Sequence, residues 1–294
     1  MRIELNTVDN GTELTQAQAL GKIRNLWWNE GWKDRPASYL LGINTSAKII
    51  KGNRQAITGI LYLSPNTQSG VNLCPYASAG CIKDCLNDSG RLWMETVASQ
   101  SSGKPTARLL RTWQYLADRQ GFLAKLDKDI KRLQRIGRKK HRKIAIRLNG
   151  TSDLIWDDVI SSYPKIQFYD YTKNEERYID YIQGKLAPNY HLTFSASEHT
   201  DIGEWFTRIA NYTKDGCATI AIPFNPIAYR NILNDGYFVD NRGNYIPVYD
   251  GDKTDNRFLD DKIGIIALKA KGNKWRTNCT GFVRDYLSQS GMIV

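Results

Sequence analysis

The chain has 294 residues, of which 41% are hydrophobic and 24% are charged, and its formal net charge is +11 at pH 7. This composition is typical of a folded globular protein and excludes a fully disordered chain. The sequence has no run of roughly 20 apolar residues that could span a membrane, and its first residues lack the pattern of a secretory signal. We therefore expect a soluble cytoplasmic protein with no membrane partner, and the excess of Lys and Arg favours a polyanionic partner.

The first half of the chain is expected to hold a lead-in segment and then the first elements of the main domain. Residues 1–55 contain one helical pattern, LTQAQALGKIRNLWWNEGW, followed by a polar extended stretch. The first clear strand is predicted at 57–63, where Pro65 stops it. A long helical pattern covers about 106–136, either as one helix or as two broken near Gly121, and Gly137 is its expected stop.

Strands and short helices alternate from residue 143 onward. Strands are predicted at 143–149, 165–171, 190–196 and 217–224, and helices near 154–162, 174–183 and 202–213. A possible hairpin in YFVDNRGNYIPVYD and a last strand, IGIIALKA, follow. This alternation implies right-handed crossovers and a mostly parallel sheet. We therefore predict an α/β fold in which residues 56–294 form one catalytic domain, a complete or partial βα barrel similar to a TIM barrel.

Polar residues follow nearly every predicted strand, where parallel sheets collect their functional groups. These strand ends carry Asn66, Asn149 to Asp153, Asp170 to Lys173, Ser195 to Ser197, and Asn225. The sequence therefore predicts a site at the carboxyl edge of the sheet.

Three of the five cysteines lie within twelve residues, in the segment LCPYASAGCIKDCLNDSGR. Cys74, Cys81 and Cys85 have the spacing Cys-x6-Cys-x3-Cys, and clustered cysteines in a chain without a signal favour a metal site over disulfides. Structural zinc usually requires four ligands, so Cys279, a His or water would complete a zinc site. An iron–sulfur cluster held by three thiolates leaves one iron open for chemistry. We expect the iron–sulfur cluster; zinc and plain buried cysteines are the alternatives.

The motifs resemble those of a bacteriophage gene-product family of unknown function. Members of that family look like CP-x5-C-x3-C, then R-x-x-GTSD or a GD variant, then FY-x-YTK. The corresponding segments here are CPYASAGCIKDC, RLNGTSD and FYDYTK. The resemblance covers roughly residues 57–285, and it implies a phage-encoded protein that works in the host cytoplasm.

The chain also resembles radical S-adenosylmethionine enzymes, especially those similar to spore photoproduct lyase. Those enzymes have three cysteines after the first barrel strand, then a Thr-Asp, a Thr-Lys and a Ser-rich element at later strand ends. TSD at 151–153, TK at 172–173 and SAS at 195–197 match in order. The cysteine spacing departs from the Cys-x3-Cys-x2-Cys that is usual in that group. The resemblance implies a 4Fe-4S cluster and S-adenosylmethionine as cofactors.

The resemblance implies roles for several strand-end residues. Ser152 and Asp153 would face the methionyl or ribose part of the cofactor, Lys173 its carboxylate, and Ser195 the neighbouring hydroxyls. Asn149 joins this set if its face of the strand lines a barrel. The structural alternatives are that Asp153 caps a helix beginning at Leu154 and that Lys173 is a solvated loop residue.

Candidate catalytic residues are Asp153, Asp170 and Tyr171. Alternation along a strand places Asp170 and Tyr171 on opposite faces. Asp170 could face a barrel axis, whereas Tyr171 could donate a hydrogen.

Nine cations lie within sixteen residues between Lys128 and Lys143, at the end of the long helical pattern and in the following loop. The density exceeds what capping a helix requires, and we interpret it as a nucleic-acid contact rather than a solvated face. The residues assigned to this contact are Arg135, Arg138, Lys139, Lys140 and Arg142.

The leading hypothesis is a radical S-adenosylmethionine-type iron–sulfur enzyme acting on nucleic acid, DNA more than RNA, or on a nucleotide. A second is a metal-containing base transglycosylase that inserts deazaguanine into DNA, with Asp153 and Asp170 as nucleophile and acid/base. The third is a non-catalytic, zinc-stapled nucleic-acid-binding protein. Iron content distinguishes the first hypothesis from the other two.

Overall fold

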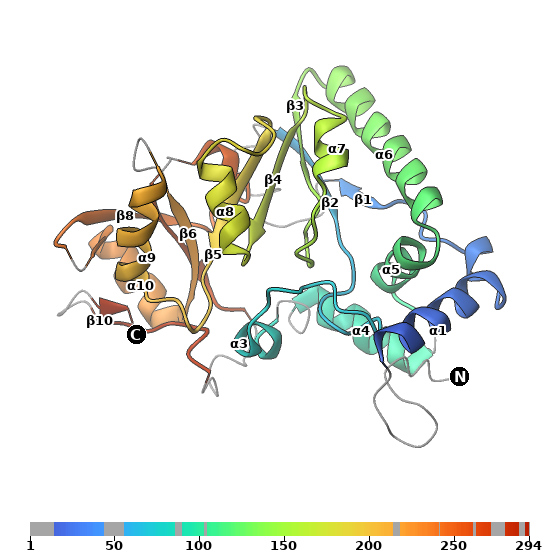
Figure 1. Ribbon diagram of the computed structural model, residues 1–294, viewed down its shortest axis with the longest axis horizontal. Helices are drawn as coiled ribbons and strands as arrows, with labels where there is room; N and C mark the ends of the chain where they lie inside the picture. The colour runs from blue at the N-terminus through green and yellow to red at the C-terminus, as the bar shows by residue number, and fades with distance from the viewer. Residues whose placement is uncertain are drawn as a thin grey trace. The chain divides into compact units, whose positions relative to one another are not determined.

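The computed structural model describes residues 15–43, 56–85, 90–102, 105–213, 218–240, 242–260, 263–271, 280–287 and 292–293. The chain divides into two compact units (Figure 1). Unit 1 comprises residues 1–45, 55–75 and 86–155, and unit 2 comprises residues 46–54, 76–85 and 156–294. The predicted boundary at residue 55 is not tested by this division and stays a prediction.

In the part of unit 1 that the structure describes, three strands combine with helices. Its elements are α1 (Gln16–Trp28), a 3-10 turn η1 (Trp32–Asp34), β1 (Leu41–Ile43), β2 (Ala56–Leu61), α4 (Gly90–Ser102), α5 (Ala107–Ala117), α6 (Arg119–Lys139) and β3 (Lys143–Arg147). β2 lies between β1 and β3, antiparallel to β1 and parallel to β3. The parallel register runs from Ala56 beside Lys143 to Ile60 beside Arg147. The carboxyl ends of β2 and β3 therefore lie at the same edge.

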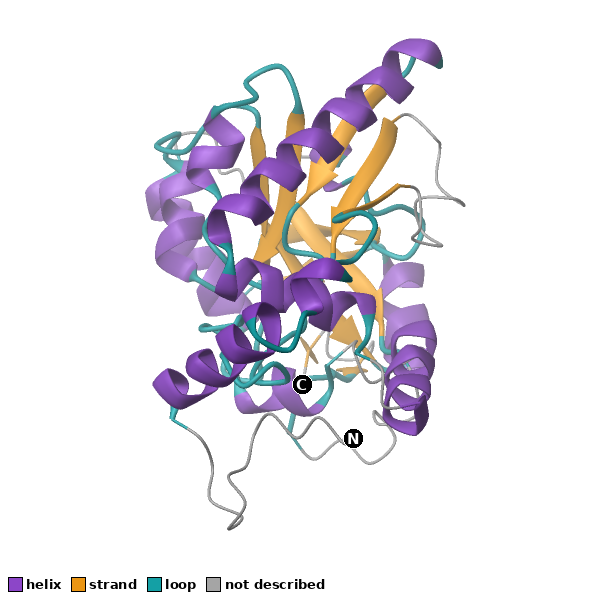
Figure 2. Cartoon of the chain, turned by 90° about the vertical axis from the view of Figure 1, so that its right-hand side faces the viewer, coloured by secondary structure: helices purple, strands orange, loops and turns teal. Residues whose placement is uncertain are grey.

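The long helix α6 packs along these strands and is the long helix in front of them in Figure 2. Its apolar residues recur at three- and four-residue spacing, so one face is buried: Phe122, Leu126, Ile130 and Leu133. Of the two alternatives, one helix or two, the structure shows two, and the break lies at Asp118 rather than near Gly121. The Asp118 side chain accepts the Gly121 N–H at 2.9 Å and caps the start of α6.

Unit 2 contains most of the alternating elements. They are α3 (Ala79–Lys83), α7 (Asp157–Ser161), β4 (Gln167–Thr172), α8 (Glu175–Ile182), β5 (Tyr190–Ser195), α9 (Ile202–Ile209), η3 (Ala210–Tyr212), β6 (Thr219–Phe224), α10 (Pro226–Asp235), β7 (Tyr237–Val239), β8 (Tyr245–Asp250), η4 (Arg257–Leu259), β9 (Gly264–Lys269), β10 (Tyr286–Leu287) and β11 (Met292–Ile293).

The main sheet of unit 2 has the order β4-β5-β6-β9-β8-β7. Neighbouring strands are parallel from β4 through β8, and β7 and β8 form the predicted antiparallel hairpin. Aromatic packing joins the helices to the sheet, because Tyr178 of α8 lies 5.7 Å from both Phe194 of β5 and Trp205 of α9, ring centre to ring centre. A mixed α/β fold with mostly parallel strands is thus confirmed. Within each unit the described strands form an open arrangement, so a TIM-type barrel is not confirmed.

Three local predictions differ from the structure. The helix expected from about residue 154 begins at Asp157. Helix α6 continues through Gly137 to Lys139, and the structure gives this glycine a packing role instead of a stopping one: a Cβ there would lie 2.6 Å from Ile144 Cγ2. Helix α10, for which no helix was predicted, has Asn225 as its N-cap and Pro226 in its first turn. Among the described residues, no helix is long and apolar enough to cross a membrane.

Candidate functional site

The loop after β3 is organised by Asn149. This side chain is buried, its amide oxygen accepts the Leu154 N–H at 3.0 Å and the Ser152 hydroxyl at 3.0 Å, and its amide nitrogen donates to the Leu154 carbonyl at 2.9 Å. The predicted cofactor residues Asn149 and Ser152 are therefore brought together, and these hydrogen bonds shape the loop. They hold the segment that presents Asp153.

The same loop is joined to the end of β2. Gly150 donates its N–H to the Leu61 carbonyl at 3.0 Å, and a Cβ at Gly150 would lie 2.6 Å from that oxygen. Only glycine permits this close approach. The Thr151 hydroxyl donates to the Leu63 carbonyl. Hydrogen bonds thus join the segments that follow β2 and β3 in unit 1 into one surface.

Cys74 lies against this surface. Its sulfur accepts the Asn66 N–H at 3.3 Å and lies 3.7 Å from the Thr151 carbonyl oxygen, to which a thiol can donate. Asn66 reaches this position in a left-handed backbone conformation, with φ 47°. The first cysteine of the motif and the GTSD loop are therefore direct neighbours within unit 1.

A backbone hydrogen bond fixes the position of Asp153, which does not belong to a helix. Its N–H donates to the Leu73 carbonyl at 3.0 Å, next to Cys74 in the chain. The alternative that Asp153 caps a helix is wrong, because α7 begins only at Asp157, after Trp156. The backbone of the half-buried Asp153 is thereby positioned beside the start of the cysteine loop.

In unit 2, the middle cysteine lies on the short helix α3. Ser78 caps this helix, since its hydroxyl oxygen accepts the Cys81 N–H at 3.2 Å. The Ser78 hydroxyl also donates to Glu198 Oε2 at 2.5 Å, and the Gly80 N–H donates to Glu198 Oε1 at 2.7 Å. Glu198 follows β5, so this carboxylate joins the cysteine helix to the carboxyl end of a parallel strand. We call Ser78, Gly80 and Glu198 the α3 latch.

The α3 latch is tightly packed and charged. The Glu198 side chain is only 8% exposed, and a Cβ at Gly80 would lie 2.7 Å from Glu198 Oε2. Burial by itself would raise the pKa of Glu198, but the hydrogen bonds from Ser78 and Gly80 outweigh it, so that the pKa falls below its ordinary value. Glu198 is therefore a carboxylate at neutral pH.

Lys173 lies across the ends of β4 and β5. Its ammonium nitrogen is 3.1 Å from Ser195 Oγ, 2.7 Å from the Ala196 carbonyl oxygen and 3.3 Å from the Ser195 carbonyl oxygen. It also lies 4.8 Å from the centre of the Phe282 ring. The interpretation of Lys173 as a solvated loop residue is wrong, because Lys173 is half-buried and its ammonium group is hydrogen-bonded to Ser195. Contact between these two residues is what a shared site requires.

Asp170 and Tyr171 differ in their surroundings. Asp170 is fully buried, and its carboxylate accepts a hydrogen bond from the Tyr190 hydroxyl at 3.3 Å. Tyr171 is half-buried on the opposite face of β4, the face on which Tyr169 packs 5.4 Å from Phe258, ring centre to ring centre. The buried hydrogen bond from Tyr190 gives Asp170 a structural role in the fold. The catalytic roles of Asp170 and Tyr171 stay predictions.

The three loop cysteines are half-buried and are shared between the units. Cys74 belongs to unit 1, and Cys81 and Cys85 belong to unit 2. Within the part of the chain that the structure describes, no three Cys, His, Asp or Glu side chains are gathered as a metal ion would require. Cys279, considered as a fourth zinc ligand, lies outside the described residues.

The cations between Lys128 and Lys143 are of two kinds in the structure: some are exposed to solvent, and others contact the rest of the fold. Arg135 and Arg138 are exposed on α6, and Lys139 and Lys140 are exposed at its end. Arg142, by contrast, donates to the Ala56 carbonyl at 3.3 Å and so takes part in the fold.

Two residues that sequence reasoning missed complete the surroundings of α3. Glu198 forms the latch, and Arg284 donates through one nitrogen to the carbonyls of Ser197, Glu198 and Thr200 at 2.8, 3.2 and 2.9 Å. The position of Glu198 directly after the strand-end SAS was a usable signal. Arg284 had none, because it comes from a distant segment.

Comparison with known proteins gives one family. The model of the family described as Gene product 88 matches residues 40–285, well over half of the chain. No curated protein and no solved structure matches it. The predicted bacteriophage gene-product family is thereby confirmed: the chain belongs to the Gene product 88 family.

Proposed function

We propose that the chain is an enzyme of the radical S-adenosylmethionine type, acting on nucleic acid or a nucleotide in the host cytoplasm. In this proposal Cys74, Cys81 and Cys85 hold a 4Fe-4S cluster, and the parallel strands belong to a partial barrel. One observation carries it: the cysteine loop is anchored at two points to segments that follow parallel strands. Cys74 contacts the loop after β3, and α3 is held by Glu198 after β5.

The chemistry of the donors fits an iron–sulfur cluster. Three sulfur ligands come from twelve consecutive residues, and cysteine thiolates are the usual ligands of such clusters. The Asn66 N–H already points at the Cys74 sulfur, and N–H groups of this kind stabilise thiolate charge and tune cluster potential. When bound, the reduced cluster would supply an electron to activate S-adenosylmethionine.

The protein's own groups would bind and orient the cofactor. In unit 1, the carboxylate of Asp153 suits an ammonium group, and Asn149 with Ser152 fixes the loop that carries it. In unit 2, the ammonium of Lys173 suits a carboxylate, and the Ser195 hydroxyl beside it suits a ribose or carboxylate oxygen. The resemblance assigns both groups to one cofactor.

The first test is iron and sulfide analysis of protein purified without oxygen, with visible spectra before and after dithionite. We expect about four irons and four sulfides per chain and a band that bleaches on reduction. Cys81→Ala should lose the iron and the colour, whereas Cys217→Ala, outside the cysteine loop, should retain both. One zinc and no colour would overturn the proposal and favour the transglycosylase or the zinc-stapled binding protein.

The second test measures cofactor binding without catalysis. Calorimetry of the anaerobic protein with S-adenosylmethionine should show binding that Lys173→Met weakens, because the ammonium charge is lost while most of the side-chain volume remains. Lys165→Met, at an exposed position before β4, is the matched control. Equal affinity in the two variants would remove Lys173 from the cofactor site.

A further inference from the structure

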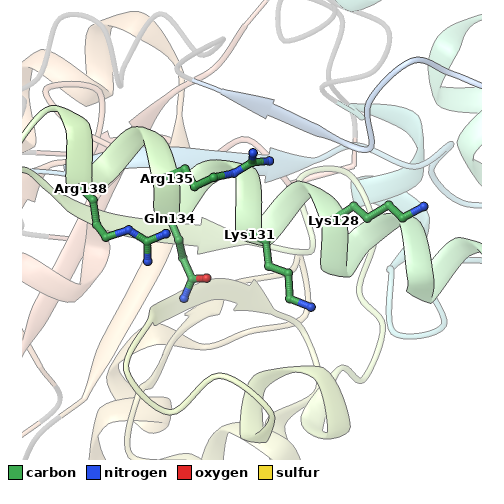
Figure 3. A pocket seen from close by; sticks show the side chains of 5 residues that line it. All are labelled: Lys128, Lys131, Gln134, Arg135 and Arg138. Atoms are coloured by element: carbon green, nitrogen blue, oxygen red, sulfur yellow. The ribbon is translucent and has the colours of Figure 1, made fainter.

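The outer face of helix α6 carries a row of cations beside a groove. Lys128, Lys131, Arg135 and Arg138, here called the basic stripe, line an open groove of about 410 Å³ together with Gln134 (Figure 3). At 3.6 residues per turn these side chains fall within an arc of about 120°. With a rise of 1.5 Å per residue, the stripe is about 15 Å long.

The stripe is separate from the face that stabilises the fold. The buried face of α6, with Phe122, Leu126, Ile130 and Leu133, lies on the opposite side of the helix. Arg132, between the two faces, is engaged in the fold: its guanidinium stacks 3.8 Å from the centre of the Tyr39 ring and pairs with Asp129 at 3.5 Å. Its removal would therefore change stability, whereas the stripe residues are exposed.

Most of the stripe charge is not neutralised within the protein. Lys128, Arg135 and Arg138 make no ion pair or hydrogen bond through their side chains with any residue in the described part of the chain. Lys131 pairs with Asp127 at 2.7 Å, but the two side chains are 63% and 39% exposed, and such surface pairs are weak. Four cations along about 15 Å repel one another and attract condensed anionic charge.

We propose that the basic stripe binds the sugar–phosphate backbone of a nucleic-acid strand. This inference deepens the proposed function, on which it rests, by naming a nucleic-acid strand rather than a single nucleotide as the substrate. Phosphates repeated along a strand match a row of cations, and Gln134 adds a hydrogen-bonding amide to the groove. An anionic membrane fits less well, since membrane-surface helices expose large apolar side chains, and among the described residues α6 exposes none.

The test is fluorescence anisotropy with labelled single-stranded DNA, duplex DNA and RNA oligonucleotides between 50 and 200 mM salt. The stripe variant changes Lys128, Lys131, Arg135 and Arg138 to Gln, which keeps good helix propensity. The control variant changes Lys165, Arg230, Lys253 and Lys269 to Gln, four exposed cations that do not belong to α6, with the same loss of charge. Circular dichroism checks that both variants fold.

We expect the stripe variant to bind at least about tenfold more weakly and its log–log salt slope to become shallower by about 2.8 to 3.6, at roughly 0.7 to 0.9 for each of the four lost phosphate contacts. The control should bind like the unmodified protein. Equal weakening in both variants, or no weakening in the stripe variant, would overturn the inference. So would stripe-dependent binding to anionic phosphatidylserine vesicles without oligonucleotide binding.

The outcome of this binding test can be distinguished from the outcome of the test for the proposed enzyme. Cys81→Ala removes a proposed cluster ligand in unit 2 and leaves α6 unchanged. If the stripe binds nucleic acid, this variant should bind with unaltered affinity even when it holds no iron. Lost colour with retained oligonucleotide binding, and retained colour with lost binding in the stripe variant, identify the two activities independently.

Discussion

The sharpest structural prediction concerns the α3 latch. Replacing Glu198 by Ala removes the acceptor of two hydrogen bonds, from the Ser78 hydroxyl and the Gly80 N–H. Hydrogen bonds to a charged group contribute about 1.5–3 kcal/mol each, and water entering the half-buried loop compensates part of the loss. We therefore expect the free energy of opening α3 to fall by about 2–4 kcal/mol, because the helix is too short to be stable without tertiary contacts.

Hydrogen exchange measures this opening directly. The Ile82 and Asp84 amides, which donate to the Ser78 and Gly80 carbonyls at 3.0 and 2.9 Å, report on α3. A loss of 2–4 kcal/mol corresponds to exchange about 30- to 700-fold faster. Glu198→Gln retains one acceptor oxygen and should accelerate exchange less than Glu198→Ala does.

The control is Asp201→Ala, in the same loop after β5. Asp201 caps α9 by accepting the Glu204 N–H at 2.8 Å, so its loss should cost about 1 kcal/mol in α9 and leave α3 exchange unchanged. Unchanged exchange at Ile82 and Asp84 in Glu198→Ala would refute the latch. Equal acceleration in the two variants would show a general loss of stability instead.

Two further predictions concern buried ionisable groups. Burial, with the nearby Arg257 charge, lowers the pKa of His191 from 6.5 to about 4. The unfolded chain therefore binds the extra proton between these values, and stability should fall by up to about 3 kcal/mol as pH falls from 6.5 to 4, an effect that His191→Gln abolishes in urea unfolding. The Asp129 carboxylate accepts the Leu40 N–H at 2.6 Å, so Asp129→Ala should cost about 3 kcal/mol by the same assay. A cost below about 1 kcal/mol would contradict the assigned role of Asp129.

Regular elements could be predicted because their signals are local. The three- and four-residue spacing of Leu126, Ile130 and Leu133 is enough to predict a helix. The alternation of strands with short helices from residue 143 indicated a parallel sheet. The predicted ends of helices were less accurate where a residue type can have either of two structural roles. Gly137 was expected to stop a helix, but its use is close contact with Ile144, which the local sequence does not reveal.

The candidate site could be predicted in part for the same reason. Polar strand ends indicated Lys173 and Ser195, and the structure brings them within 3.1 Å. The alternative that Asp153 caps a helix was reasonable from type and position alone. It failed because the Asn149 side chain bonds both the N–H and the carbonyl of Leu154, and the helix begins only at Asp157.

The sequence by itself determined the α/β class, the hairpin, the cysteine loop and the concentration of positive charge, because each depends on residues close together in the chain. The tertiary structure alone decided which charges remain available and what holds α3. Arg142 contacts Ala56, and Gly80 contacts Glu198 across 118 residues. Such pairs join residues that are far apart in the chain and meet only in the folded protein, so no local pattern could indicate them.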